Sequence, residues 1–208
     1  MATRLSPDAR RQQLLDAAGA ILSERGLDAV RIPDVARAAG VTRPVVYKFF
    51  PNRRALVMDL LEDFVEALEA RFLRCLAVSP MGMEPLARAL ASACCDLIEE
   101  KGKGAWMLLG ASDGDPELAQ VTRAFHARLV APWVHRITEI TGAAETNVVT
   151  AVAMMAGASR AAIGLWIDGQ VSREQAVEAL ITGINALIGA FTTTGKPIED
   201  VWANWVTG

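Results

Sequence analysis

The sequence has few of the residues from which disulfide frameworks and metal sites are built. Its 208 residues include three cysteines and two histidines. An odd number of cysteines, with Cys94 next to Cys95, does not form a disulfide framework and fits a reducing cytoplasm. His126 and His135 are nine residues apart and adjacent cysteines diverge on a helix, so neither pair has the spacing of a metal site. We therefore expect no disulfide, no metal and no cofactor.

The sequence also lacks the apolar segments that target a chain or anchor it. The N-terminus has no apolar stretch of the signal-peptide kind. The most apolar region, 146–167, is rich in alanine and glycine and is interrupted by Arg160, whereas a membrane span needs about 20 mostly apolar residues. We expect this region to be a buried helix, and the protein to be soluble and cytoplasmic, without a membrane partner.

Charge is distributed unevenly along the chain. The whole sequence is 52% hydrophobic and 22% charged with a net charge of −3, which is typical of a folded globular protein. Residues 1–54 hold ten lysines and arginines against five acidic residues, whereas residues 55–208 hold eleven against nineteen. A basic N-terminal part followed by an acidic remainder indicates a polyanionic partner at one end only.

Helical periodicity recurs along the chain, and no window shows the two-residue alternation of a half-buried strand. Ser6 and Pro7 are typical of an N-cap and a first helical position, and Gly26 ends that helix. Ser172 and Gln175 have capping-box spacing. Helices are predicted over 7–25, 33–39, 42–50, 54–78, 84–101, 145–167 and 172–191. A further helix is predicted to begin at about residue 115. The sequence predicts an all-α protein.

One part of the basic region has the spacing of a helix-turn-helix. Ala36, Gly40 and Val46 stand in the order A-x3-G-x5-V. Ala36 is small because a second helix crosses close to it, and Gly40 can adopt the positive φ that a tight turn requires. Val46 and Phe50 lie on one helical face, which we expect to be buried. The other face of this helix is then presented to solvent.

That exposed face combines cations with a tyrosine and suits duplex DNA. A short helix fits the major groove, where arginine can pair with guanine and valine can contact a thymine methyl group. Hydroxyl groups, lysine, and a cation at the start of the next helix can hold phosphates. The residues predicted to contact DNA are Thr42, Arg43, Pro44, Val45, Tyr47, Lys48 and Arg53. For four other arginines of this region a solvated helix face is preferred over a DNA contact: Arg10, Arg11, Arg25 and Arg37.

The stretch LLDAAGAILSERGLDAVRIPDVARAAGVTRPVVYKFFPNRRALV resembles the N-terminal domain of TetR-type transcriptional regulators. The resemblance implies a DNA-binding domain over 8–68, with the motif at 31–50, and a helical ligand-binding and dimerisation domain over 69–208. It also implies a homodimer that represses at a palindromic operator until a small molecule releases it. Two positions differ from the family. Arg31 replaces a capping threonine, so the cap comes from elsewhere or Arg31 reaches a phosphate, and Arg53 replaces lysine.

Bulky apolar residues of the second part of the chain are individually typical of a core, but together they can line a cavity. The resemblance implies an effector pocket there, and few charges lie among these residues, so we expect an apolar effector. The candidate pocket residues are Trp106, Met107, Phe125, Trp133, Met154, Met155 and Trp166.

The last two long helices carry small and branched residues that allow close helix packing. In the resembled family the corresponding helices form a four-helix dimer interface. The candidate interface residues are Ala156, Gly157, Ala161, Gly164, Ile181, Ile184, Leu187 and Ile188. The alternative is that these helices only close the protomer's own bundle.

Two other function classes fit parts of the sequence less well. The segment GASDG at 110–114 matches G-x-S-x-G around Ser112, the nucleophile of an esterase-like enzyme. That motif requires a strand-to-helix turn with a histidine and an acid nearby, and no strand is predicted here, so we expect no enzyme. The other class is a helical small-molecule-binding protein without a DNA function.

Overall fold

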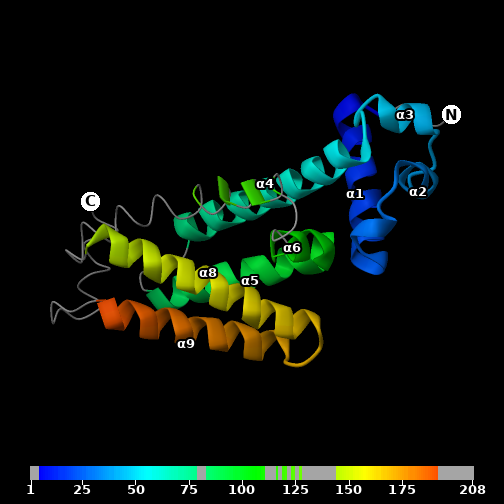
Figure 1. The fold of residues 1–208 in the computed structure, drawn as a ribbon. Coiled ribbons are helices and arrows are strands. Elements are labelled where there is room, and N and C mark those ends of the chain that lie inside the picture. Colours follow the sequence, from blue (N-terminus) through cyan, green and yellow to red (C-terminus); the bar gives the residue numbers. More distant parts are fainter. Residues whose placement is uncertain are drawn as a thin grey trace. The chain divides into compact units, whose positions relative to one another are not determined.

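The computed structural model describes residues 5–78, 83–110, 116, 119–120, 123–124, 127 and 144–191, and the regular elements within them are all helical (Figure 1). The predicted all-α class is confirmed. The elements are α1 (Pro7–Arg25), the 3-10 turn η1 (Leu27–Ala29), α2 (Ile32–Ala38), α3 (Arg43–Tyr47), α4 (Arg53–Val78), α5 (Met83–Lys101), α6 (Lys103–Gly110), α8 (Glu145–Ile167) and α9 (Arg173–Phe191).

The chain divides into two compact units. The first contains Met1–Ala67 and Leu97–Thr122, and the second contains Leu68–Asp96 and Arg123–Gly208. The domain boundary predicted after residue 68 stays a prediction.

Local sequence signals set the ends of the first helices. The Ser6 hydroxyl accepts a hydrogen bond from the Ala9 N–H at 3.2 Å, and Pro7 is the first helical residue, as predicted. Gly26 follows α1 with a φ of 77°, which L-residues rarely adopt. Asn52 caps α4, because its side-chain oxygen accepts the Ala55 N–H at 2.9 Å.

The helix predicted over 42–50 is shorter than expected. Regular helix ends at Tyr47, although Phe49 and Phe50 still donate their N–H groups to the Val46 carbonyl at 3.0 and 2.9 Å. The reason is Pro51, which disfavours helical geometry in the residue before it. A tight turn therefore links α3 to α4.

Helix α6 was not predicted, and it packs against α1 within the first unit. Gly102 ends α5 with a φ of 84°, and the Gly104 N–H donates to the Ser23 hydroxyl of α1 at 3.1 Å. A Cβ added to Gly104 would lie 2.5 Å from Leu22 Cγ, so only glycine permits this approach. Lys101 also pairs with Asp63 at 2.7 Å. These contacts join residues far apart in the sequence.

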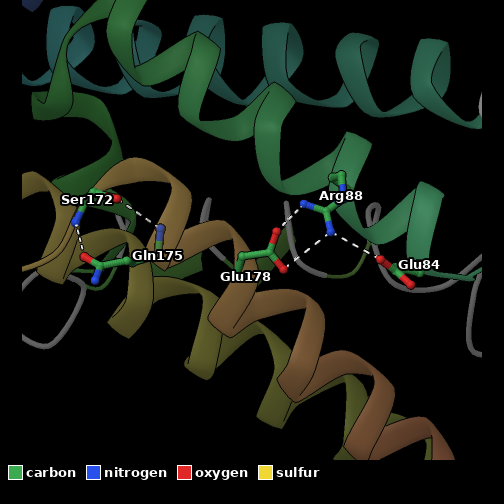
Figure 2. Close-up of polar contacts among 5 residues, drawn as sticks. All are labelled: Glu84, Arg88, Ser172, Gln175 and Glu178. Atoms are coloured by element: carbon green, nitrogen blue, oxygen red, sulfur yellow. Dashed lines mark hydrogen bonds and ion pairs between the residues drawn. The ribbon is translucent and has the colours of Figure 1, made fainter.

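In the second unit, α8 and α9 run antiparallel and lie side by side (Figure 1). The predicted capping box opens α9: the Ser172 N–H donates to Gln175 Oε1 at 2.8 Å, and the Gln175 N–H donates to Ser172 Oγ at 3.2 Å (Figure 2). At the other end of the connection, Gly169 follows α8 with a φ of 71°. The two helices are thus joined by a defined turn.

Charged side chains connect α5 to α9. Arg88 pairs with Glu178 across the two helices and with Glu84 one turn away at 3.2 Å (Figure 2). Hydrogen bonding to Arg88 holds the pKa of Glu178 below its ordinary value. Arg173 pairs with Asp96 of α5 in the same way. These surface pairs link α9 to α5 and are expected to add little to stability, because they are exposed.

Helix α8 is not buried, contrary to the expectation for the alanine- and glycine-rich region at 146–167. Only 18% of its most apolar window is buried. It is also the one helix in the described ranges with the length and apolarity of a membrane span, a test that helices of soluble proteins also pass. The apolar composition therefore marks an exposed face and not a core helix.

Candidate nucleic-acid interface

The turn between α2 and α3 is a Schellman motif centred on Gly40. The Val41 N–H donates to the Ala36 carbonyl at 2.9 Å, and the Gly40 N–H donates to the Arg37 carbonyl at 3.2 Å. Gly40 has a φ of 65°, and a Cβ placed on it would meet nothing within 4 Å. Glycine is therefore required here by the backbone conformation alone, and the two helices are turned sharply against each other.

This turn presents one face of α3 to solvent. Val46 and Phe50 are fully buried, as the sequence predicts. Thr42, Arg43, Pro44, Tyr47 and Lys48 are exposed, Tyr47 to 53%, while Val45 is half-buried. Thr42 is the N-cap residue of α3, but its hydroxyl makes no capping bond. The Thr42 hydroxyl on this exposed face is therefore not used as a helix cap.

A polar side chain of α1 supports the turn from behind. Gln13 donates from Nε2 to the Ala39 carbonyl at 3.0 Å and accepts from Arg10 Nη1 at 2.6 Å. The carbonyl at the end of α2, just before Gly40, is thus satisfied from another helix. Arg10, interpreted from the sequence as solvated, is half-buried and also donates a hydrogen bond to Gln13.

Arg11 of α1 also has a structural partner. Its guanidinium pairs with Asp59 of α4 at 2.8 Å and lies 6.0 Å from the centre of the Phe50 ring. A guanidinium at this distance from an aromatic ring is weakly attracted to it. Arg11 therefore joins α1 to α4, and its side chain stays 42% exposed to solvent.

The two basic residues that flank the motif both bind backbone carbonyls. Arg31 is the N-cap residue of α2 without a side-chain capping bond, and its Nε donates to the Asp28 carbonyl at 3.1 Å. Arg53 donates from Nε to the Val30 carbonyl at 2.8 Å and from Nη2 to the Leu27 carbonyl at 2.6 Å. Sequence reasoning missed these contacts, because their acceptors are backbone atoms that no motif encodes.

The candidate pocket residues are only partly described. Phe125 and Trp133 lie outside the described residues. Met107 of α6 and Met154 of α8 are exposed, to 54% and 53%. Trp106, Met155 and Trp166 are half-buried. The assignment of these residues to an effector pocket stays a prediction.

The candidate interface residues divide into two groups. Gly157 and Gly164 of α8 face open space, since a Cβ on either would meet nothing within 4 Å, and Ala161 is exposed. Ile181 of α9 is instead buried inside the protomer. Ala156 and Ile184 are half-buried, and the side chains of Leu187 and Ile188 lie outside the described set. Among the candidates whose side chains are described, Gly157, Ala161 and Gly164 of α8 are therefore open to a partner, whereas Ile181 is not.

The residues of the enzyme hypothesis cannot be placed: Ser112, His126 and His135 lie outside the described residues. Within the part of the chain that the structure describes, no three His, Cys, Asp or Glu side chains come together as metal ligands would. Cys94 and Cys95 are buried and unbridged, and burial raises the pKa of the Cys94 thiol well above its ordinary value. A thiol in that state is a poor nucleophile.

Comparison with known proteins points to one family. Residues 14–60 match the family described as bacterial regulatory proteins, tetR family. The HTH-type transcriptional activator FasR of Mycolicibacterium smegmatis is 34% identical over 101 residues, which are 49% of this chain and 46% of that protein. The HTH-type transcriptional repressor KstR2 of the same organism is 31% identical over 84 residues, 40% of this chain and 41% of that one. Each match thus spans less than half of the relative's length.

The fold extends the likeness over the rest of the chain. The crystal structure of a TetR-like transcriptional regulator from Rhodococcus sp. RHA1 has a TM-score of 0.72 at 17% identity, covering 93% of this chain and all of that one. At that identity the comparison concerns the fold alone.

Proposed function

We propose that this chain, whose residues 14–60 match the tetR family of bacterial regulatory proteins, is a homodimeric transcriptional regulator that binds a palindromic operator. It represses transcription from the cytoplasm as a soluble protein, and a small apolar effector releases it from DNA. No metal, cofactor or catalytic step is part of this function. The observation that carries the proposal is the turn at Gly40, which buries Val46 and leaves Arg43, Tyr47 and Lys48 exposed.

In the proposed complex α3 enters the major groove. Arg43 pairs with a guanine edge, and Val45 contacts a thymine methyl group. Tyr47, Lys48 and the Thr42 hydroxyl hold phosphates, as do Arg31 and Arg53 at the flanks of the motif. Pro44 is tolerated in the first turn, because the N–H that it lacks would have no intrahelical partner there. The basic character of residues 1–54 supports this assignment.

Dimerisation sets the spacing of the two reading helices. We assign DNA binding to 8–68 and ligand binding with dimerisation to 69–208. Two copies of α3 read half-sites about 34–36 Å apart, or a multiple of that distance. The exposed small residues of α8 support an interface there. An effector releases the protein by binding more tightly to a dimer whose α3 helices no longer match the groove.

Selection of bound fragments from genomic DNA tests the proposal directly. We expect the purified protein to enrich a short palindrome, and affinity for that duplex to fall steeply as salt rises, because binding releases counterions from the phosphates and this release is less favourable at high salt. Enrichment of no sequence, with no affinity for any duplex, would remove the DNA-binding function. A small-molecule-binding protein without a DNA function would give that result.

The sign of regulation needs its own test, because the relatives include one named an activator and one named a repressor. A reporter placed behind the selected operator should be silenced when the protein is co-expressed. Increased reporter output would make the protein an activator.

A further inference from the structure

Arg53 joins the two ends of the segment that contains the helix-turn-helix. It is the first residue of α4, and its guanidinium reaches back to the carbonyls of Val30 and Leu27, at 2.8 and 2.6 Å. Val30 directly precedes the N-cap of α2. Segment 30–53, with α2, the Gly40 turn and α3 inside it, is therefore closed at its base by one side chain.

The chemistry of this closure depends on the guanidinium. Hydrogen bonds from a charged donor are roughly twice as strong as neutral ones, and the planar fork of arginine fixes the direction of each bond. The Leu27 carbonyl also accepts the Val30 N–H of the 3-10 turn at 3.1 Å. Arg53 thus binds both ends of η1 at once, whereas the compact ammonium of lysine has no fixed geometry to hold two carbonyls.

We propose that Arg53 is a positioning residue for α3, acting through the carbonyls of Leu27 and Val30 in addition to attracting a phosphate. This inference rests on the proposed DNA-binding function. By fixing the base of segment 30–53, Arg53 limits how far α3 can tilt in the groove. Correct tilt matters for contacts with base edges and much less for attraction to the phosphate backbone.

The substitution Arg53→Lys separates the two roles, because it keeps the charge and removes the fork. We expect operator affinity to fall roughly tenfold, as for the loss of one charged hydrogen bond. Affinity for an unrelated duplex of the same length should stay unchanged, and so should the dependence of both affinities on salt. The ratio of specific to non-specific affinity is the quantity that reports positioning.

Two matched variants complete the experiment. Arg25→Lys replaces an exposed arginine at the end of α1 and should change neither affinity. Arg53→Gln removes the charge as well, so both affinities should fall and the salt dependence should decrease by about one phosphate contact. Thermal unfolding of each variant without DNA confirms that it is folded at the assay temperature.

The outcomes are distinct. If wild-type protein binds no duplex, the proposed function fails and the inference fails with it. If the wild type binds its operator but Arg53→Lys retains the full ratio, or loses both affinities equally, Arg53 is only a phosphate contact or a general support, and the inference alone is overturned. Unfolding of Arg53→Lys at the assay temperature would also overturn it, because the residue would then stabilise the whole domain.

Discussion

The outer surface of α3 and one face of α8 are both exposed, but they expose different chemistry. Around α3 the exposed residues are cations, a hydroxyl and Tyr47, on a backbone fixed by Gly40 and by the buried Val46. The α8 face consists of exposed or open positions at Met154, Gly157, Ala161, Gly164 and Leu165. Charged groups are stable in water, whereas a contiguous apolar face usually marks an interaction surface. The two surfaces therefore call for different partners.

The largest effect on affinity is expected on the α8 face. An introduced charge there shows whether a second copy of the chain covers this face. Leu165→Glu would place an unpaired carboxylate in a dimer interface, which costs several kcal/mol. We expect the dimer dissociation constant to rise by about 100-fold or more, measured by analytical ultracentrifugation. Operator affinity should fall with it, because one protomer reads only one half-site.

The matched control for this substitution lies on another helix. Leu73→Glu changes a leucine of α4 that is 62% exposed, compared with 41% for Leu165. It should leave the dimer intact. A stable dimer of Leu165→Glu would show that α8 only closes the protomer's own bundle and that its exposed face does not bind a second copy.

On the α3 surface, the double substitution Arg43→Ala with Tyr47→Ala should abolish recognition without unfolding the protein. A good contact to a base edge contributes about 1–3 kcal/mol, and a phosphate contact is lost with it, so we expect operator affinity to fall about 100-fold. Both side chains are exposed and Val46 keeps the core, so the midpoint of thermal unfolding should not change. Fluorescence anisotropy with labelled operator gives the affinity. Unchanged binding would assign the reading surface to another element.

The features that could be predicted from the sequence are those formed by residues close together in the chain. The Ser6 cap, the Gly40 turn and the Ser172–Gln175 capping box are all made within five residues, so their spacing appears in the sequence. The burial of Val46 and Phe50 follows from helical periodicity in the same way. Local chemistry therefore predicted the fold class and which face of α3 is exposed.

The features that the sequence did not predict depend on contacts between residues far apart in the chain. Helix α6 begins with an N–H that Ser23 caps from 81 positions away, and Arg53 binds carbonyls 23 and 26 positions before it. No short pattern contains such pairs. The expectation that α8 is buried failed for a related reason, because composition shows that a helix is apolar and does not show what covers it.

Replacing a glycine by alanine should change the free energy of unfolding by a smaller amount, and in opposite directions at the two surfaces. Gly40→Ala forces a side chain into a φ of 65°, which should lower the free energy of unfolding by about 1 kcal/mol and weaken operator binding. Gly157 lies within α8, and a Cβ added to it would meet nothing within 4 Å. Gly157→Ala should therefore stabilise the isolated protomer by about 0.5–1 kcal/mol. In a dimer, however, the added methyl group would separate the helices. Urea unfolding and sedimentation distinguish these effects, and equal stability changes at both glycines would contradict them.

The smallest expected effect is a pH dependence confined to the second unit. Hydrogen bonding to Arg88 lowers the pKa of Glu178, and hydrogen bonds to its own backbone N–H and to Ser172 lower the pKa of Glu174. A carboxyl group whose pKa is lower in the folded state stabilises the protein above its unfolded pKa, about 4.3, and loses this contribution as pH falls through the folded value.

Glu178→Gln should therefore narrow the difference in unfolding temperature between pH 6 and pH 3, with only a small change because the pair is exposed. Operator affinity at neutral pH should be unchanged in this variant, since Glu178 does not belong to the α3 surface. A drop in operator affinity for Glu178→Gln would instead show that the Arg88–Glu178 pair acts on α3, and the two surfaces could no longer be treated as independent.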